Sequence, residues 1–163
     1  MRFTAATPAA APAIAALRTA TAVALTARYG YGHWSSCASE SAVLLDLRVP
    51  IVCAGWCGDR LLATFRLATK RPWAIDPSYF SDCRRPLYLT SMSVEPDAQL
   101  RGIGRQCIEE ARRVARDWPA DSIRLDAYDA EAGAGGFYAK AGFREVGRVV
   151  YRGTPLVYYE LLL

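Results

Sequence analysis

The stretch that decides the fold runs Val-Glu-Pro-Asp-Ala-Gln-Leu-Arg-Gly-Ile-Gly-Arg, from Val94 to Arg105. It joins two segments of different periodicity. The run Leu87–Val94 before it is apolar and β-prone, and the run Gln106–Trp118 after it has apolar residues at helical spacing. A strand is therefore expected to lead into a glycine-rich turn, and that turn is expected to open a helix.

Four residues of this turn favour the binding of an anion. The first N–H groups of a helix have no partner inside the helix, and the helix dipole adds about half a positive charge at that end. Gly102 and Gly104 let a ligand approach the backbone, while Arg101 and Arg105 add full charges. The combination predicts a pyrophosphate site, and the alternative is a tight turn without a ligand. The dinucleotide fingerprint is excluded because Cys107 replaces its third glycine.

The same turn carries a family signature. Gln99-Leu-Arg-Gly-Ile-Gly104 reads Gln/Arg-x-x-Gly-x-Gly/Ala, and Val94-Glu-Pro96 precedes it. Both features resemble the coenzyme A pyrophosphate loop of the GNAT N-acyltransferase superfamily. The resemblance implies that coenzyme A is bound by the residues of this loop, which are Gln99, Leu100, Arg101, Gly102, Ile103, Gly104 and Arg105.

A second motif supports the first. Gly136-Phe-Tyr-Ala-Lys-Ala-Gly-Phe143 resembles the Phe-Tyr-x-x-x-Gly-Phe signature that ends the last GNAT helix, and a predicted strand separates the two motifs. The resemblance implies that the Tyr138 hydroxyl faces the coenzyme sulfur. The alternative is a core tyrosine with a satisfied hydroxyl. One position departs from the family, because Glu131 stands where an asparagine is frequent, at the place of contacts with the pantetheine arm.

The resemblance also implies a mechanism, in which an amine attacks a thioester and negative charge builds on the carbonyl oxygen. A bulge in the strand before the loop would aim the Met92 N–H at that oxygen. Val94 would pair with the pantetheine amides, and Tyr138 would protonate the leaving thiolate as a general acid. The general base is left open, since Tyr88 stands where some relatives carry a glutamate. The residues considered for it are Glu95, Asp126, Asp129 and His33.

The whole chain, residues 1–163, predicts one GNAT-like domain of the α/β class (α+β type), with a central mixed sheet of about six to seven strands and about four helices. Strands are expected at Arg2–Ala5, Pro50–Trp56, Leu61–Ala68, Leu87–Val94, Ser122–Ala127, Phe143–Tyr151 and Thr154–Leu162. Beside the helix after the loop, helices are expected at Ser39–Leu47, at Ala130–Ala141 and after a Thr7 cap with Pro8 at the first position. The apolar face of that first helix is expected to hold Ile14, Leu17, Ala20, Val23 and Ala24. The segment Lys70–Pro86 reads as a loop.

Composition narrows the choice of partners. The net charge of +4 is spread along the chain rather than clustered, so a nucleic-acid partner is not expected. The five cysteines show no metal-ligand spacing and there is one histidine, so no metal is expected and a reduced, cytoplasmic setting is the simplest account. No apolar run looks long enough to span a bilayer, so no membrane partner is expected. The first 39 residues lack acidic side chains, as transit peptides do, but they also supply a strand and a helix that the domain needs.

The sequence thus predicts an N-acetyltransferase that moves an acetyl group from acetyl-coenzyme A to a primary amine of a small molecule or peptide, by direct attack in a ternary complex. The alternative is a non-catalytic coenzyme A-binding or regulatory module on the same fold. The apolar C-terminus, Leu161–Leu163, also suggests a homodimer.

Overall fold

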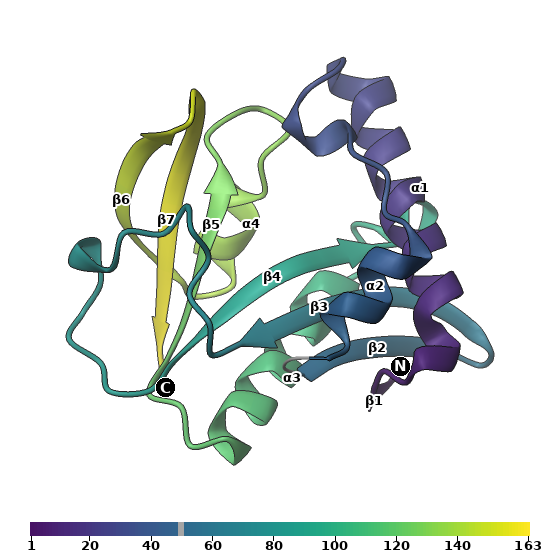
Figure 1. Ribbon diagram of the computed structural model, residues 1–163, viewed down its shortest axis with the longest axis horizontal. Coiled ribbons are helices and arrows are strands. Elements are labelled where there is room, and N and C mark those ends of the chain that lie inside the picture. The colour runs from purple at the N-terminus through teal and green to yellow at the C-terminus, as the bar shows by residue number, and fades with distance from the viewer. Residues whose placement is uncertain (49–50) are drawn as a thin grey trace.

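The computed structural model describes residues 1–48 and 51–163, and in these residues it has one mixed sheet of seven strands in the order β1-β2-β3-β4-β5-β7-β6 (Figure 1). The strands span Arg2–Ala5 (β1), Ile51–Cys57 (β2), Arg60–Ala68 (β3), Pro86–Val94 (β4), Ser122–Tyr128 (β5), Arg144–Tyr151 (β6) and Thr154–Leu162 (β7). The predicted fold class is therefore confirmed. The predicted strand start at Pro50 lies outside the described residues.

The sheet opens in its middle. Every neighbouring pair is antiparallel except β4 and β5, which are parallel. These two strands pair only where Pro86–Tyr88 lies beside Ser122–Arg124. Beyond Tyr88 they diverge, as Figure 1 shows. The gap between them points toward the end of β4, where the glycine-rich turn begins.

Helices cover both faces of the sheet (Figure 1). On one face, α1 (Ala11–Tyr29) and α2 (Glu40–Asp46) form a core with alternate residues of β2, such as Val52 and Ala54. On the other face, α3 (Ile103–Asp117) packs on β3, β4 and β5, and its apolar stripe is fully buried. The short helix α4 (Gly135–Lys140) lies beside β7.

The first helix differs from its prediction. It begins at Ala11 after a 3-10 turn, Pro8–Ala10, and the Thr7 side chain makes no capping hydrogen bond. Pro12 fits in the first helical turn, where its missing N–H would have no partner anyway. The predicted apolar face is wrong at Val23, which is 57% exposed. Alanines and threonines surround this helix, so its sequence has little contrast between faces.

Two further elements are corrected by local geometry. The last helix begins at Gly135 rather than Ala130, because the chain first turns tightly with the Gly133 N–H bonded to the Ala130 carbonyl. A Cβ at position 133 would lie 1.9 Å from the Tyr128 carbonyl oxygen, so only glycine fits there. The predicted loop at 70–86 contains a 3-10 turn, Pro77–Tyr79.

One segment, Pro8–Tyr29, is long and apolar enough to cross a membrane by length and composition, which corrects the expectation that no run is. In the fold, Ile14 and Leu17 are buried in the core that α1 forms with the sheet. Arg18, in the middle of the segment, is paired with Asp46. These contacts are those of a core helix in a folded domain.

Candidate active site

A cleft of about 440 Å³ lies at the point where the sheet opens. It is bounded by α1, the end of β4, the opening of α3 and the segment that leads into α4. The residues that line it are Thr21, Leu25, Tyr29, Met92, Ser93, Val94, Gln99, Leu100, Gly102, Gly104, Arg105, Glu131, Ala132, Gly133, Ala134, Phe137 and Tyr138.

Strand β4 carries a bulge beside this cleft. Its register with β3 pairs Thr90 with Arg66 and Ser93 with Thr64, so two β4 residues face one residue of β3. Neither Ser91 nor Met92 has a partner in the register, and Ser91 has a φ of 51°. A bulge frees backbone groups from the ladder and redirects the chain. The structure therefore has an irregular strand at the place where the family resemblance implies a bulge.

The turn after β4 has the geometry of a helix opening onto the cleft. Gly102 has a φ of 81°, a conformation that favours glycine, and its carbonyl accepts the first helical hydrogen bond, from Gln106. The N–H groups of the residues between them are the unpaired ones of a helix N-terminus. The Gln99 side chain donates to the Val94 carbonyl at 3.1 Å, which closes the turn on the strand.

Tyr138 stands on the other side of the gap. Its hydroxyl lies 3.9 Å from the sulfur of Met92. Its ring packs among aromatic rings with centroids 5.2 to 6.0 Å away, those of Phe137, Phe143 and Tyr159. Burial raises the pKa of Tyr138 above its ordinary value, and nearby Asp126 and Cys107 raise it further. The hydroxyl therefore keeps its proton at neutral pH and is able to donate it.

Most of the predicted site residues meet in this cleft. It is lined by Met92, Val94, Gln99, Leu100, Gly102, Gly104, Arg105, Glu131 and Tyr138. Arg101 is exposed and Ile103 is 8% exposed in the core, and neither lines the cleft. Because its side chain is in the core, Ile103 can offer a ligand only its backbone N–H. Sequence reasoning missed Thr21, Leu25 and Tyr29 of α1, whose four-residue spacing was the available signal.

Comparison with known proteins then decides the family. Residues 58–145, more than half of the chain, match the family described as "Acetyltransferase (GNAT) domain". The chain belongs to the GNAT acetyltransferase family. The resemblance drawn from the two sequence motifs is thereby confirmed. No curated protein matches the sequence.

Solved structures share the GNAT fold over nearly the whole chain. Ribosomal-protein-alanine N-acetyltransferase from Brucella melitensis has a TM-score of 0.76 at 19% identity, covering 100% of both chains. Aminoglycoside 6'-acetyltransferase type Ii has a TM-score of 0.71 at 15% identity, covering 99% of this chain and 97% of its own. A Bacillus subtilis acetyltransferase in complex with CoA has a TM-score of 0.58 at 21% identity, covering 77% and 84%. At such identities these structures show the fold and not the substrate.

The candidate bases of this GNAT protein differ in their surroundings. His33 bonds Thr154 at 2.8 Å and stacks on Tyr128, so it ties the α1–α2 connection to β7. Asp129 pairs with Arg148 at 3.0 Å, and Glu95 lies 3.6 Å from Arg60. The Asp126 carboxyl makes no ion pair and accepts no hydrogen bond from another residue that the structure describes. Burial raises the pKa of Asp126 above the ordinary value, in the direction that makes a carboxylate a stronger base, although its own backbone N–H lowers this pKa slightly.

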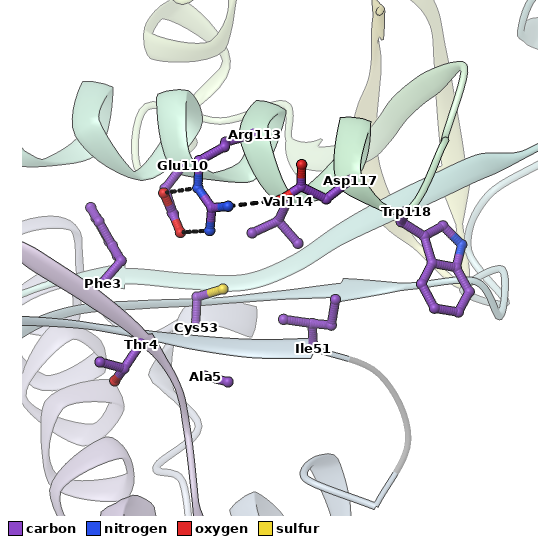
Figure 2. A pocket seen from close by; sticks show the side chains of 10 residues that line it. All are labelled: Phe3, Thr4, Ala5, Ile51, Cys53, Glu110, Arg113, Val114, Asp117 and Trp118. Atoms are coloured by element: carbon purple, nitrogen blue, oxygen red, sulfur yellow. Dashed lines mark hydrogen bonds and ion pairs between the residues drawn. The ribbon is translucent and has the colours of Figure 1, made fainter.

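A second cavity, of about 350 Å³, lies between β1, β2 and α3 (Figure 2). Its polar side chains are already paired, since Arg113 bonds both Glu110 and Asp117 at 2.7 Å (Figure 2). Burial raises the pKa of Cys53 to about 12, so its thiol is not a nucleophile at neutral pH. This cavity offers no free reactive group among the described residues, so the candidate site is the cleft beside Met92 and Tyr138. No metal-ligand cluster occurs in the described part of the chain.

Proposed function

We propose that the protein transfers an acetyl group from acetyl-coenzyme A to a primary amine by direct attack in a ternary complex. The observation that carries this proposal is the meeting of three features in one cleft, namely the β4 bulge at Met92, the N-terminus of α3 and the buried Tyr138 hydroxyl. Both a peptide amine and a small-molecule amine fit the proposal, since the similar structures include enzymes named for each.

The cleft suits coenzyme A by charge and by shape. Unpaired N–H groups at the opening of α3 face it, and Arg105 lies on its rim while Arg101 stands exposed beside it. Apolar side chains of α1 and α4, such as Leu25 and Phe137, also line the cleft, and the Phe137 ring lies against Gly104. The helix end would hold the pyrophosphate, and the end of β4 at Val94 would lie along the pantetheine arm.

The bound donor supplies a thioester carbonyl carbon for the amine to attack and a thiolate that leaves as the C–S bond breaks. The Met92 N–H, which has no partner in the strand register, would stabilise charge on the carbonyl oxygen. Tyr138 gives its proton to the leaving sulfur and regains one from solvent. Asp126, through a water molecule, takes the proton that the amine loses.

Direct attack is favoured over an acetylated cysteine. None of the described residues that line the cleft is a cysteine. Cys107 is buried next to the site, and burial raises its pKa to about 12, so it remains a thiol at neutral pH. A nucleophilic cysteine needs the opposite shift and an exposed position.

The test couples binding to turnover. Acetyl-coenzyme A at 100 times its dissociation constant should stabilise the protein by roughly 2.7 kcal/mol, seen as a rise in melting temperature. Thiol release with a panel of primary amines should then fall about 10²-fold or more in Tyr138→Phe, with the thermal shift retained. Tyr31→Phe, at a 91% exposed tyrosine outside the cleft, should keep full activity as the matched control.

The alternative, a coenzyme A-binding module without catalysis, draws on Glu131. This carboxylate lines the cleft where the family frequently has an asparagine, and it would lie near the pantetheine arm. A normal thermal shift with no thiol release for any amine, and no difference between wild type and Tyr138→Phe, would establish that alternative.

A further inference from the structure

Unpaired polar atoms gather at one place beside the cleft. Among the described residues, five buried side-chain atoms have no hydrogen-bond partner, and four of them belong to Arg18, Arg66 and Thr90. Arg18 and Arg66 both bind the Asp46 carboxylate, at 2.7 and 2.5 Å. Arg66 is directly opposite Thr90 in the register of β3 and β4. Buried polar atoms are nearly always paired with protein groups or with water, so this concentration marks a place where a bound molecule would find hydrogen-bond donors.

The cluster of Arg18, Asp46, Arg66 and Thr90 adjoins the cleft on two sides. Thr21, three residues along α1 from Arg18, lines the cleft, and residues at that spacing are neighbours on a helix surface. Ser93, which follows Thr90 on the same face of β4 because of the bulge, also lines it. The Arg66 side chain is 25% exposed and the Arg18 side chain 11%, so Arg66 is the more open of the two to a bound molecule.

The charge of the cluster and its hydrogen-bond donors indicate what kind of molecule it would bind. Two guanidinium groups and one carboxylate leave the cluster with one positive charge. Each guanidinium has five N–H donors and no acceptor, and Asp46 takes only one bond from each. A molecule bound here would therefore accept hydrogen bonds, and a carboxylate would also balance the positive charge.

The opposite charge stands nearby on the same face of the sheet. Tyr88 pairs with Arg124 across β4 and β5, so Thr90 and Asp126 lie two residues further along the same face. Arg66 and Asp126 are thus two strand spacings apart, roughly 10 Å or somewhat more where the strands diverge. A positive group and a carboxylate at this separation match a molecule that has both an ammonium group and a carboxylate.

We propose that the acceptor amine carries a carboxylate close to its nitrogen, as a free amino acid does, and that Arg66, positioned by Arg18 and Asp46, binds that carboxylate. The amine nitrogen then points toward the gap between β4 and β5, where Asp126 receives its proton. This inference rests on the proposed acetyl transfer and adds its substrate class.

The test uses substrate pairs that differ only in the carboxylate. L-phenylalanine and L-phenylalaninamide form one pair, and leucine and alanine with their amides provide others, because the cluster binds only the carboxylate and selects no side chain. The wild type should prefer the acid by at least about tenfold in kcat/KM, the effect of a hydrogen-bonded charge. The amine of the amide is the easier one to deprotonate, so this preference cannot come from the amine itself.

Variants assign the preference to the cluster. Arg66→Gln should reduce kcat/KM for the acid at least about tenfold more than for the amide, through KM. Arg66→Lys keeps the charge but loses the planar fork, and it should fall between. Arg116→Gln, at an exposed arginine on α3 away from the cleft, should leave both substrates unchanged. As a readout without turnover, N-acetyl-L-phenylalanine added to saturating coenzyme A should raise the melting temperature of the wild type above its value with coenzyme A alone. It should give no such further rise in Arg66→Gln.

The outcomes separate the two proposals. Turnover of amines without any preference for the acid, or an equal loss for acid and amide in Arg66→Gln, overturns the carboxylate site and leaves acetyl transfer standing. Absence of turnover for every amine overturns both proposals.

Discussion

Two charge clusters in this molecule contain the same kinds of charged residue, but they differ in whether all of their buried polar atoms are hydrogen-bonded. Each contains two arginines and one carboxylate on the same face of the sheet. Arg124 and Arg144 meet Glu160 at 3.2 and 3.3 Å, and Glu160 also accepts from the backbone and side chain of Ser81. None of the buried side-chain atoms in this first cluster lacks a partner among the described residues. The cluster of Arg18, Asp46, Arg66 and Thr90 is the one with atoms left over.

The difference teaches what each cluster does. The Glu160 cluster fastens the segment between β3 and β4 to β5 and β7, because the Arg124 guanidinium also binds the Ser81 carbonyl and lies over the Phe80 ring. It is complete without a ligand and acts as a structural clamp. The Asp46 cluster holds α2 against α1 and β3 but keeps donors in excess next to the cleft. A buried network with atoms to spare is expected at a binding site rather than in a core.

The largest effect is expected from Glu160→Gln. Removing one charge from a buried pair leaves Arg124 uncompensated, which typically costs about 3–5 kcal/mol of unfolding free energy. Urea denaturation measures it. Glu145→Gln, in an exposed pair with Arg148, is the control and should change the unfolding free energy far less, because solvent screens an exposed pair. Equal costs for the two changes would mean that the Glu160 cluster is no clamp.

A smaller loss, about 1–3 kcal/mol, is expected from Asp46→Asn, because two guanidinium groups then lack their shared acceptor. Added formate, compared with chloride at the same ionic strength, should restore part of the lost stability by entering the cluster. Glu160→Gln should gain nothing from formate, since its surroundings are filled. An Asp46→Asn protein indifferent to formate would show that the cluster admits no carboxylate.

The smallest change in unfolding free energy is expected from Asp126→Asn, and this substitution should stabilise the protein. Burial raises the folded-state pKa of this carboxyl, so the folded state binds the proton more tightly than the unfolded state. The resulting stability is complete below the unfolded pKa, about 3.9, and is lost as the pH rises through the folded pKa. Asp126→Asn should therefore be more stable than wild type at pH 7, and the gain should shrink as the pH approaches 4.

The same substitution, Asp126→Asn, also leads to a prediction about catalytic activity. If Asp126 is the base, Asp126→Asn should lower kcat by about 10²-fold or more while gaining stability. Asp129→Asn, which loses an exposed pair with Arg148, should show neither change. An Asp126→Asn enzyme with an unchanged kcat would mean that another group is the general base.

Much of this molecule could be predicted from sequence because the deciding features are local. The turn from Val94 to Arg105 and the helix behind it are contiguous, and their glycines and periodicity indicate their structure directly. The Ser39 cap, which accepts from the Ala42 N–H at 3.2 Å, is also a local feature. The cluster around Asp46 could not be predicted, because its members come from α1, α2, β3 and β4 and meet only through tertiary packing.

The buried face of α1 could not be predicted correctly for a related reason. A helix of alanine and threonine buries whichever side its neighbours approach, so the exposure of Val23 follows from packing and not from its own sequence. The homodimer and the cytoplasmic location stay predictions. Of the C-terminal leucines, Leu161 and Leu163 pack in the core of their own chain and only Leu162 is 58% exposed.

The bulge in β4 also sets which way the strand's side chains point. Successive residues of a strand alternate between faces, and the extra residue at Ser91 reverses that alternation for the rest of β4. Met92 and Val94 therefore turn toward the core under α3, and Ser93 turns the other way. Deleting Ser91 would keep these orientations while pairing Met92 with Phe65 in an unbroken ladder. Such a deletion would produce a more regular sheet, in which the Met92 N–H is bonded within the ladder. A single deletion could therefore make the sheet more regular and remove the group proposed to stabilise the oxyanion.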